Sequence, residues 1–284
     1  MTSKFLLALA LTIAAPFIGG LVTGIDRKIT ARLQSRYGPP IAQPFYDVLK
    51  LLGKDRMVVN MWQALCPVVT LTASALCVFL FGMQADLLLI FFVLTVGGVF
   101  LIMGAMAAPS PYSQIGAQRE LMQMLAYEPL LILVFVSFSM VTGSFKIADV
   151  YAYGRPLLPQ LPLMFIVLGY ALTIKLRKSP FDIAACHHAH QEIVRGVLTE
   201  YSGPNLALIE IAHWFDVALI LGLCSLFWST SALGAATLLA GAYFLELVID
   251  NVTARMTWRF MLQNALGVGL ALSVLNIVWQ SFNN

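Results

Sequence analysis

Charged residues are scarce in this sequence. Asp, Glu, Lys and Arg make up 11% of its 284 residues, whereas 60% of the residues are apolar. A water-soluble globular domain carries roughly 25% charged residues, enough to cover its surface with groups that favour water. This composition, with a mean hydropathy of +0.84, excludes a water-soluble enzyme and an intrinsically disordered chain. It indicates instead a protein that crosses a membrane several times.

Residues that hold redox cofactors are also scarce. The four cysteines are far apart and form no C-x-x-C pair, and three of them (Cys66, Cys77 and Cys224) lie in apolar stretches, where a small-hydrophobe role is expected. A haem held between two helices needs two facing histidines, and the apolar stretches contain only His213. A glycine-rich phosphate-binding loop is absent too. We therefore expect no redox cofactor, nucleotide or nucleic acid to bind here, and in an electron-transfer complex other subunits would carry the electrons.

Apolar stretches long enough to cross a bilayer occur about eight times. A bilayer core of ~30 Å needs roughly 20 helical residues. The sequence therefore predicts an all-α, polytopic membrane protein that forms a single integral membrane domain over residues 1–284. The expected spans are 4–25, 60–83, 86–108, 120–142, 159–176, 206–229, 232–250 and 260–281. The fifth of these is short, and the fourth contains Glu128 next to Pro129.

The basic residues are distributed unequally between the two sides of the membrane. With eight spans, 14 of the 17 Lys and Arg residues fall in the connections after the first, third, fifth and seventh spans. Basic loops stay in the cytoplasm. We therefore expect both termini to be extracytoplasmic, and the two long polar loops, about 26–57 and 177–205, to be cytoplasmic. The protein is expected in the inner (cytoplasmic) cell membrane.

Several acidic residues lie inside the predicted spans. Such groups are costly in a bilayer and often mark an ion path. Glu210, His213 and Asp216 are spaced three residues apart, so neighbouring members lie side by side on one helix. Glu128, Glu246 and Asp250 lie in other spans. The alternatives are that each acid has only a structural role, and that Asp250 pairs with Arg255.

The two polar loops contain further features. Phe45, Val48, Leu49 and Leu52 form one apolar face of a predicted helix, which could lie at the lipid interface or form the floor of a docking site. Cys186, His187, His188 and His190 lie close together in the second loop. They could bind a metal, handle protons at an interface, or have no special role. We expect no metal site.

Four separated motifs resemble one known family. Arg36-Tyr37-Gly38-Pro39, Tyr127-Glu128, Pro180-Phe181-Asp182 and Thr199-Glu200-Tyr201-Ser202-Gly203 are similar to signatures of the heel membrane subunit of respiratory complex I. That subunit connects the peripheral redox arm to the membrane arm. The His-Ala-His-Gln-Glu and Glu-Ile-Ala-His-Trp strings look like the version in energy-converting nickel-iron hydrogenases of the Ech type, with the formate-hydrogenlyase and carbon-monoxide-linked types as close relatives.

This resemblance implies a role in coupling electron transfer to proton or sodium translocation. The implied proton path consists of Glu128, Asp182, Glu192, Glu200, Glu210, His213, Asp216 and Glu246. The implied interface with peripheral subunits consists of Arg27, Arg32, Arg36, Tyr37, Gly38, Pro39, His187, His188 and His190.

The resemblance also implies partners. These are the large and small hydrogenase subunits, an iron–sulfur ferredoxin-like subunit and an antiporter-like membrane subunit, with ferredoxin as indirect electron donor. The nickel-iron centre and the iron–sulfur clusters would then reside in those partners. Two alternatives remain, namely a quinone-binding subunit of a complex I-type NADH dehydrogenase and a stand-alone cation transporter.

Overall fold

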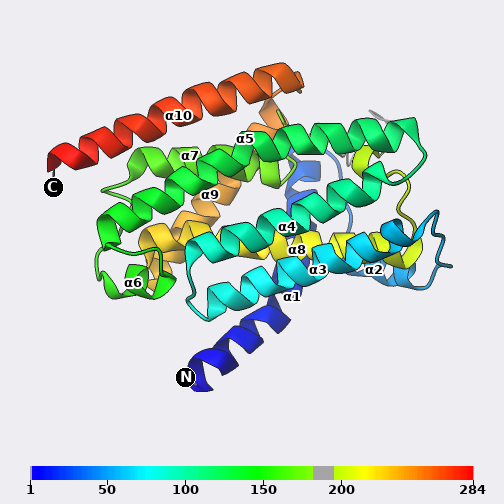
Figure 1. Cartoon of the computed structure of the whole chain (residues 1–284), viewed down its shortest axis with the longest axis horizontal. Coiled ribbons are helices and arrows are strands. Elements are labelled where there is room, and N and C mark those ends of the chain that lie inside the picture. Colours follow the sequence, from blue (N-terminus) through cyan, green and yellow to red (C-terminus); the bar gives the residue numbers. More distant parts are fainter. Residues whose placement is uncertain (1, 182–194, 284) are drawn as a thin grey trace. The chain divides into compact units, whose positions relative to one another are not determined.

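The computed structural model describes residues 2–181 and 195–283, and within these ranges the chain is helical with no named strand. Figure 1 shows the helices with their labels. Their bounds are α1 Thr2–Leu33, α2 Gln43–Leu52, α3 Met61–Gly82, α4 Leu87–Met106, α5 Pro111–Thr142, α6 Ile147–Ala152, α7 Pro162–Lys175, α8 Gly203–Ser225, α9 Ala232–Val252 and α10 Trp258–Asn283, with short 3-10 turns at Gly196–Leu198 and Leu226–Trp228.

Seven of these helices are long and apolar enough to cross a membrane: α1, α3, α4, α5, α8 (with the turn after it), α9 and α10. The fifth expected span corresponds to the 14-residue helix α7, which at 1.5 Å per residue is about 21 Å long and is not among these seven. The all-α, multi-pass architecture is thus confirmed. The extracytoplasmic placement of both termini stays a prediction.

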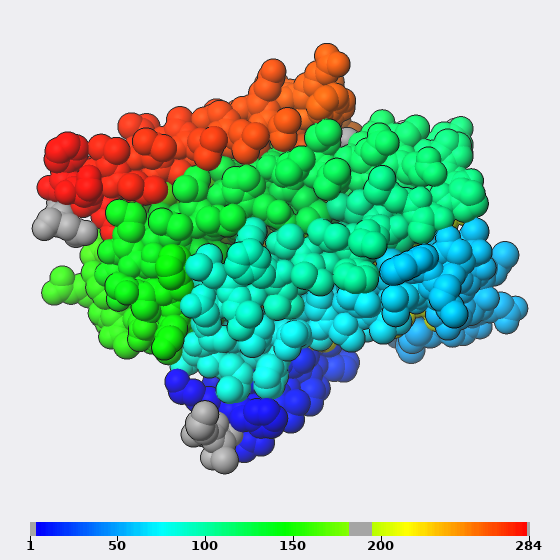
Figure 2. Space-filling view, in the orientation of Figure 1, coloured from blue at the N-terminus to red at the C-terminus, as the bar shows by residue number. Residues whose placement is uncertain are grey.

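Large apolar side chains are exposed along the predicted spans. On α10, whose surface is visible in orange and red in Figure 2, Leu275 is 59% exposed and Val274 is 56% exposed. On α1, Ile13 is 61% exposed. A water-soluble protein rarely exposes continuous apolar surface of this kind. Surfaces like these are what contact with lipid chains requires.

Two helices extend beyond the spans predicted for them. α1 continues to Leu33, so Arg27 and Arg32 are helical rather than in a loop. It ends where Ser35 adopts a positive φ of 57° and the sequence reaches Gly38 and two prolines. α5 begins nine residues before the predicted start, at Pro111. Apolar composition defines the part of a helix that suits lipid, but backbone hydrogen bonds continue past it.

The helices divide into two compact units. Unit 1 contains the chain up to Met83, Phe92–Leu121 and the segment that ends at Leu219; unit 2 contains Gln84–Phe91, the segment from Met122 through α7, and the chain from Ile220 onward. In unit 1, α3 packs along α1 and α2 contacts α1; in unit 2, α7 packs against α10 and α9. The acids of the predicted path are therefore distributed over both units.

Candidate functional site

The start of α3 holds the segment that carries the Glu-Tyr-Ser-Gly motif. Asn60 caps α3 by accepting a hydrogen bond of 2.8 Å from the backbone N–H of Gln63, and the Gln63 carboxamide oxygen accepts from the N–H of Val59. Gln63 is almost completely buried, and its Nε2 donates to the backbone carbonyl of Glu200 at 2.7 Å. One capping side chain thus fixes the start of a span and the position of Glu200.

Two glycines allow close packing around this motif. Gly203, at the start of α8, has a φ of +53°, and a Cβ there would lie 2.6 Å from the carbonyl oxygen of Asp55. A Cβ on Gly104 of α4 would lie 2.0 Å from the hydroxyl oxygen of Tyr201. That hydroxyl is buried and makes no hydrogen bond to a described residue. Burial raises the pKa of the Tyr201 phenol, so it stays protonated.

The predicted series of acids on one helix is present on α8, in unit 1. Glu210, His213 and Asp216 lie in its first two thirds and are all partly buried. The Ser74 hydroxyl of α3 donates to Oδ1 of Asp216 at 2.8 Å. A hydroxyl donor stabilises the ionised form of a carboxylate, and it can also accept a proton from the neutral form. The arrangement thus places three titratable groups in a row with a hydroxyl at the far end.

The amphipathic helix α2 packs against the same part of α8. Val48 forms a small core with Ala207 and Trp214, and the Phe45 ring lies 5.1 Å from the Trp214 ring between centroids. Only two of the four residues of the predicted apolar face pack on this core. Leu49 is 64% exposed and Leu52 is 47% exposed, whereas Leu51 packs on the core instead. The packing face follows the direction in which α8 crosses α2, and helical spacing alone does not specify that direction.

Three of the predicted docking residues near the end of α1 are exposed, namely Arg32, Arg36 and Tyr37. Arg32 lies over the Tyr37 ring, 5.0 Å from its centroid, and the Tyr37 side chain is exposed. Gly38 has a φ of +75°, and a Cβ there would lie 2.8 Å from that of Ala31. Arg27 differs because it forms an ion pair with Asp47 of α2 at 3.0 Å. Arg36 is exposed beside Tyr37, and Pro39 follows Gly38 in the turn.

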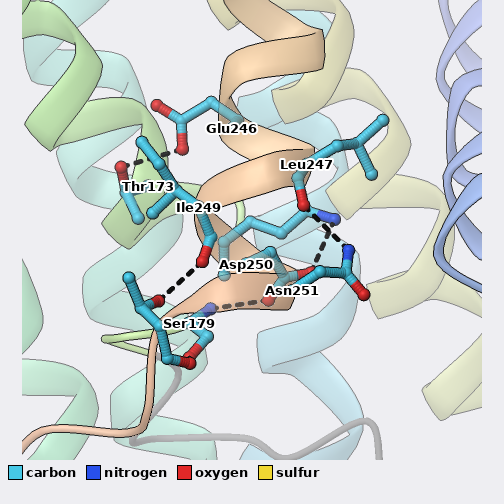
Figure 3. Close-up of polar contacts among 9 residues, drawn as sticks. Thr173, Ser179, Glu246, Leu247, Ile249, Asp250 and Asn251 are labelled. Carbon is cyan, nitrogen blue, oxygen red and sulfur yellow. Dashed lines mark hydrogen bonds and ion pairs between the residues drawn. The ribbon is translucent and has the colours of Figure 1, made fainter. Parts of the chain in front are cut away.

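The second group of acids lies in unit 2. Glu128 is partly buried on α5, followed by the in-helix Pro129, and Lys175 of α7 lies over the neighbouring Tyr127 ring at 5.6 Å. Glu246 of α9 is 4% exposed, and its Oε2 is 2.9 Å from the Thr173 hydroxyl of α7, as drawn in Figure 3.

The end of α9 holds the segment that follows α7. Asp250 accepts from the Ser179 backbone N–H at 2.9 Å and forms an ion pair of 3.3 Å with the buried Lys178. The described ion-pair partner of Asp250 is therefore Lys178, and a pairing of Asp250 with Arg255 stays a prediction. Lys178 lies within reach because the chain turns back onto α9 directly after α7, a tertiary contact that sequence proximity does not reveal.

Several predicted residues are not placed by these contacts. Asp182, Glu192, Cys186, His187, His188 and His190 lie outside the described residues. Within residues 2–181 and 195–283, no group of three His, Cys, Asp or Glu side chains could hold a metal ion. The structure brings Glu200, Glu210, His213 and Asp216 into one unit, and Glu128 and Glu246 into the other. A continuous path through all eight predicted members remains a prediction.

Sequence reasoning missed the neutral and basic partners of these acids. They are Ser74, Gln63, Thr173 and Lys178. For the hydroxyl partners, the one available sequence signal was a Ser or Thr inside an apolar span. It is a weak signal, because such a side chain most often bonds a carbonyl of its own helix.

Comparison with known proteins places the chain in a family. The NADH dehydrogenase family pattern matches residues 5–281. Hydrogenase-4 component C of Escherichia coli (strain K12) is 29% identical over 97% of this chain and 92% of that protein. Formate hydrogenlyase subunit 4 of the same organism is 32% identical, over 72% of this chain and 69% of that protein. A subunit of the NADH-quinone oxidoreductase of Rubrobacter xylanophilus is 32% identical, over 79% of this chain and 73% of that protein.

A solved structure supports the fold. One chain of the membrane-bound sulfane sulfur reductase, an archaeal respiratory membrane complex, superposes with a TM-score of 0.87 at 24% identity, covering 98% of this chain and 99% of that chain. The family pattern, these relatives and the apolar helices agree with the resemblance of the four motifs. The chain is therefore a multi-pass membrane protein of the NADH dehydrogenase family.

Proposed function

We propose that this protein is the membrane subunit of an energy-converting nickel-iron hydrogenase complex. It would anchor the hydrogenase module and couple electron transfer between ferredoxin and protons to proton or sodium translocation. The observation that carries the proposal is the row of Glu210, His213 and Asp216 on α8, beside the Gln63-held Glu200 segment. Partly buried ionisable groups in a predicted span are costly, so they often mark an ion path.

The names of relatives favour a hydrogenase. Hydrogenase-4 component C aligns with 97% of this chain, whereas the NADH-quinone oxidoreductase protein from Rubrobacter xylanophilus aligns with 79%. The second candidate is a quinone-binding subunit of a complex I-type enzyme, which that protein's 32% identity supports. The metal content and the activity of the purified complex would distinguish these two candidates. A hydrogenase would contain nickel and iron–sulfur clusters in other subunits and evolve hydrogen from reduced ferredoxin, whereas the alternative would reduce quinone.

Coupling would proceed by displacement of charge. A change of charge at a partner's nearest cluster would alter the protonation of the loop carboxylates. Because interacting sites titrate together, that change would pass to Glu210 and onward to His213 and Asp216. Glu128 would extend the path in unit 2. The nickel-iron centre and clusters in the partners would supply the redox chemistry, and this chain would supply groups that hold and release protons.

The test is to substitute Glu128→Gln and Glu210→Gln. Glutamine retains size and hydrogen-bonding capacity but cannot ionise, so a relay loses a site while a structural acid loses about 1 kcal/mol. Hydrogen-linked proton movement in inverted vesicles is measured per assembled complex, with Glu210→Asp as a control that keeps a carboxyl group. We expect both Gln variants to assemble and to lose most of their pumping. Pumping at the parent rate in both would assign ion translocation to the partner subunits.

A further inference from the structure

The hydroxyl of Thr173 on α7 lies between two oxygen atoms. One belongs to a backbone carbonyl and can only accept a hydrogen bond, and the other belongs to a carboxyl group, which can also carry a proton. The Thr173 Oγ1 is 2.9 Å from the carbonyl oxygen of Gly169, one turn earlier on the same helix. It is also 2.9 Å from Oε2 of Glu246 on α9, as Figure 3 shows. Thr173 is 6% exposed and Glu246 is 4% exposed, so water does not compete for these contacts.

The number of hydrogen atoms distinguishes the two protonation states of Glu246. A threonine hydroxyl has one hydrogen to donate and two lone pairs that can accept. If Glu246 is ionised, that hydrogen must be shared between the Gly169 carbonyl and the carboxylate. If Glu246 is protonated, the carboxyl donates to Oγ1 and Oγ1 donates to Gly169. Only the protonated form converts both 2.9 Å contacts into full hydrogen bonds.

The burial of Glu246 without a paired cation among the described residues favours the same state. Within residues 2–181 and 195–283, no Lys or Arg nitrogen lies within ion-pair distance of Glu246. The buried ammonium of Lys178 is paired with Asp250, one turn further along α9. The other groups that face Glu246 are uncharged: the Thr173 hydroxyl, the Gly169 backbone and the Cys224 thiol of α8. A buried carboxylate without a paired cation is strongly disfavoured.

We propose that Glu246 is a proton-holding site and that the Thr173 hydroxyl is its switch. When the proton leaves, the Thr173 hydrogen turns from the Gly169 carbonyl to the carboxylate, so the ionised form retains one donor. The ionised form of Glu246 therefore keeps one hydrogen-bond donor, although it lacks a paired cation among the described residues. This makes Thr173 a positioning residue for proton transfer at Glu246.

The position of the site connects it to the segment that leads toward the predicted docking loop. Asp250, four residues after Glu246, holds the Ser179 backbone N–H and Lys178. A new negative charge at Glu246 would compete with Asp250 for Lys178. Binding and release of the proton at Glu246 would thus alter the contacts of Lys178 and Ser179, which lead toward the loop predicted to bind a peripheral subunit. This last step rests on the proposed function, whereas the protonation of Glu246 does not.

The test uses infrared difference spectroscopy on the purified complex. A protonated carboxyl has a C=O stretch that is separate from the carboxylate bands and that shifts in heavy water. We expect one such band to be lost in Glu246→Gln. It should shift in Thr173→Val, which removes the hydroxyl at similar shape, and remain in place in Thr173→Ser, which keeps the hydroxyl.

Thr70→Val is the matched control. Thr70 of α3 is buried like Thr173 and also bonds two oxygens, but both are backbone carbonyls, of Cys66 and Gly97. Its substitution should leave the band unchanged. The proposal is overturned if Glu246→Gln removes no carboxyl band, or if Thr173→Val and Thr70→Val have the same effect. Proton pumping, measured separately in these variants, tests the proposed function, because a hydrogen-bonded proton can be present in a complex that does not pump.

Discussion

The hydroxyl of Ser74 on α3 donates a 2.8 Å hydrogen bond to the carboxylate of Asp216 on α8. Ser74 is 3% exposed, so water does not compete for this polar contact between two apolar helices of unit 1. It holds the last acid of the α8 row in one orientation. The link makes Ser74 part of the candidate site, although its own sequence context resembles any apolar span.

Removing the Ser74 hydroxyl should therefore destabilise the protein. A hydrogen bond to a charged group contributes ~1.5–3 kcal/mol, and Asp216 is partly exposed, so we expect Ser74→Ala to cost about 1 kcal/mol. The thermal unfolding midpoint of the purified complex measures this loss. Ser137→Ala is the control, because the buried Ser137 bonds, among the residues that the structure describes, only the Leu133 carbonyl of its own helix. Equal midpoints for the two variants would contradict a specific role for Ser74.

Gly104 should not tolerate a side chain. A Cβ there would lie 2.0 Å from the Tyr201 hydroxyl oxygen and 2.7 Å from the Cβ of Cys66. Overpacking of this kind costs typically ~1–3 kcal/mol. We expect Gly104→Ala to lower the unfolding midpoint and the amount of assembled complex. The control is Gly241→Ala on α9, where a Cβ meets nothing within 4 Å, so that variant should be neutral or slightly more stable.

Tyr201→Phe should be neutral or stabilising by about 1 kcal/mol, because it removes a buried hydroxyl that no described residue satisfies. The pH dependence follows from the raised pKa of this phenol. Above the ordinary tyrosine pKa of ~10, the unfolded chain releases the proton and the folded chain keeps it. This contribution to stability is complete below pH ~10 and falls as the pH rises toward the folded pKa.

The parent protein should consequently lose stability relative to Tyr201→Phe only in the alkaline range. Unfolding midpoints at neutral and alkaline pH, compared with those of the exposed-site variant Tyr112→Phe, measure the difference. If the unfolding midpoints of the parent and of Tyr201→Phe differ by the same amount at neutral and alkaline pH, the phenol is solvated. A large loss of stability at neutral pH would mean that the hydroxyl has a binding partner.

The distribution of basic residues predicts that both termini are extracytoplasmic. With 14 of 17 Lys and Arg residues on one side, the positive-inside rule places that side in the cytoplasm. An alkaline phosphatase fusion after Asn284, which is active only outside the cytoplasm, should therefore be active, and a green fluorescent protein fusion should be dark. The reverse result would mean either an odd number of crossings, in which the 14-residue helix α7 does not span the membrane, or an orientation opposite to the one that the basic residues predict.

Much of the fold could be predicted from composition and from the apolar stretches. The eight stretches correspond to seven long helices and to α7, because a continuous apolar segment in a bilayer must satisfy its backbone hydrogen bonds internally. Helix ends were less predictable. α1 passes through Asp26, Arg27 and Lys28 without interruption, since charged residues are compatible with a helix and only unsuitable for lipid.

The sequence by itself determined which acids lie in spans and that Glu210, His213 and Asp216 share one side of a helix, because helical periodicity is local. Only the tertiary structure decided their partners. Thr173 and Ser137 look alike in sequence, and each hydroxyl bonds a carbonyl four residues earlier, yet Thr173 also reaches Glu246. Lys178 likewise pairs with Asp250, 72 residues away. Such contacts depend on how helices pack against each other, and packing involves residues far apart in the chain that no local pattern connects.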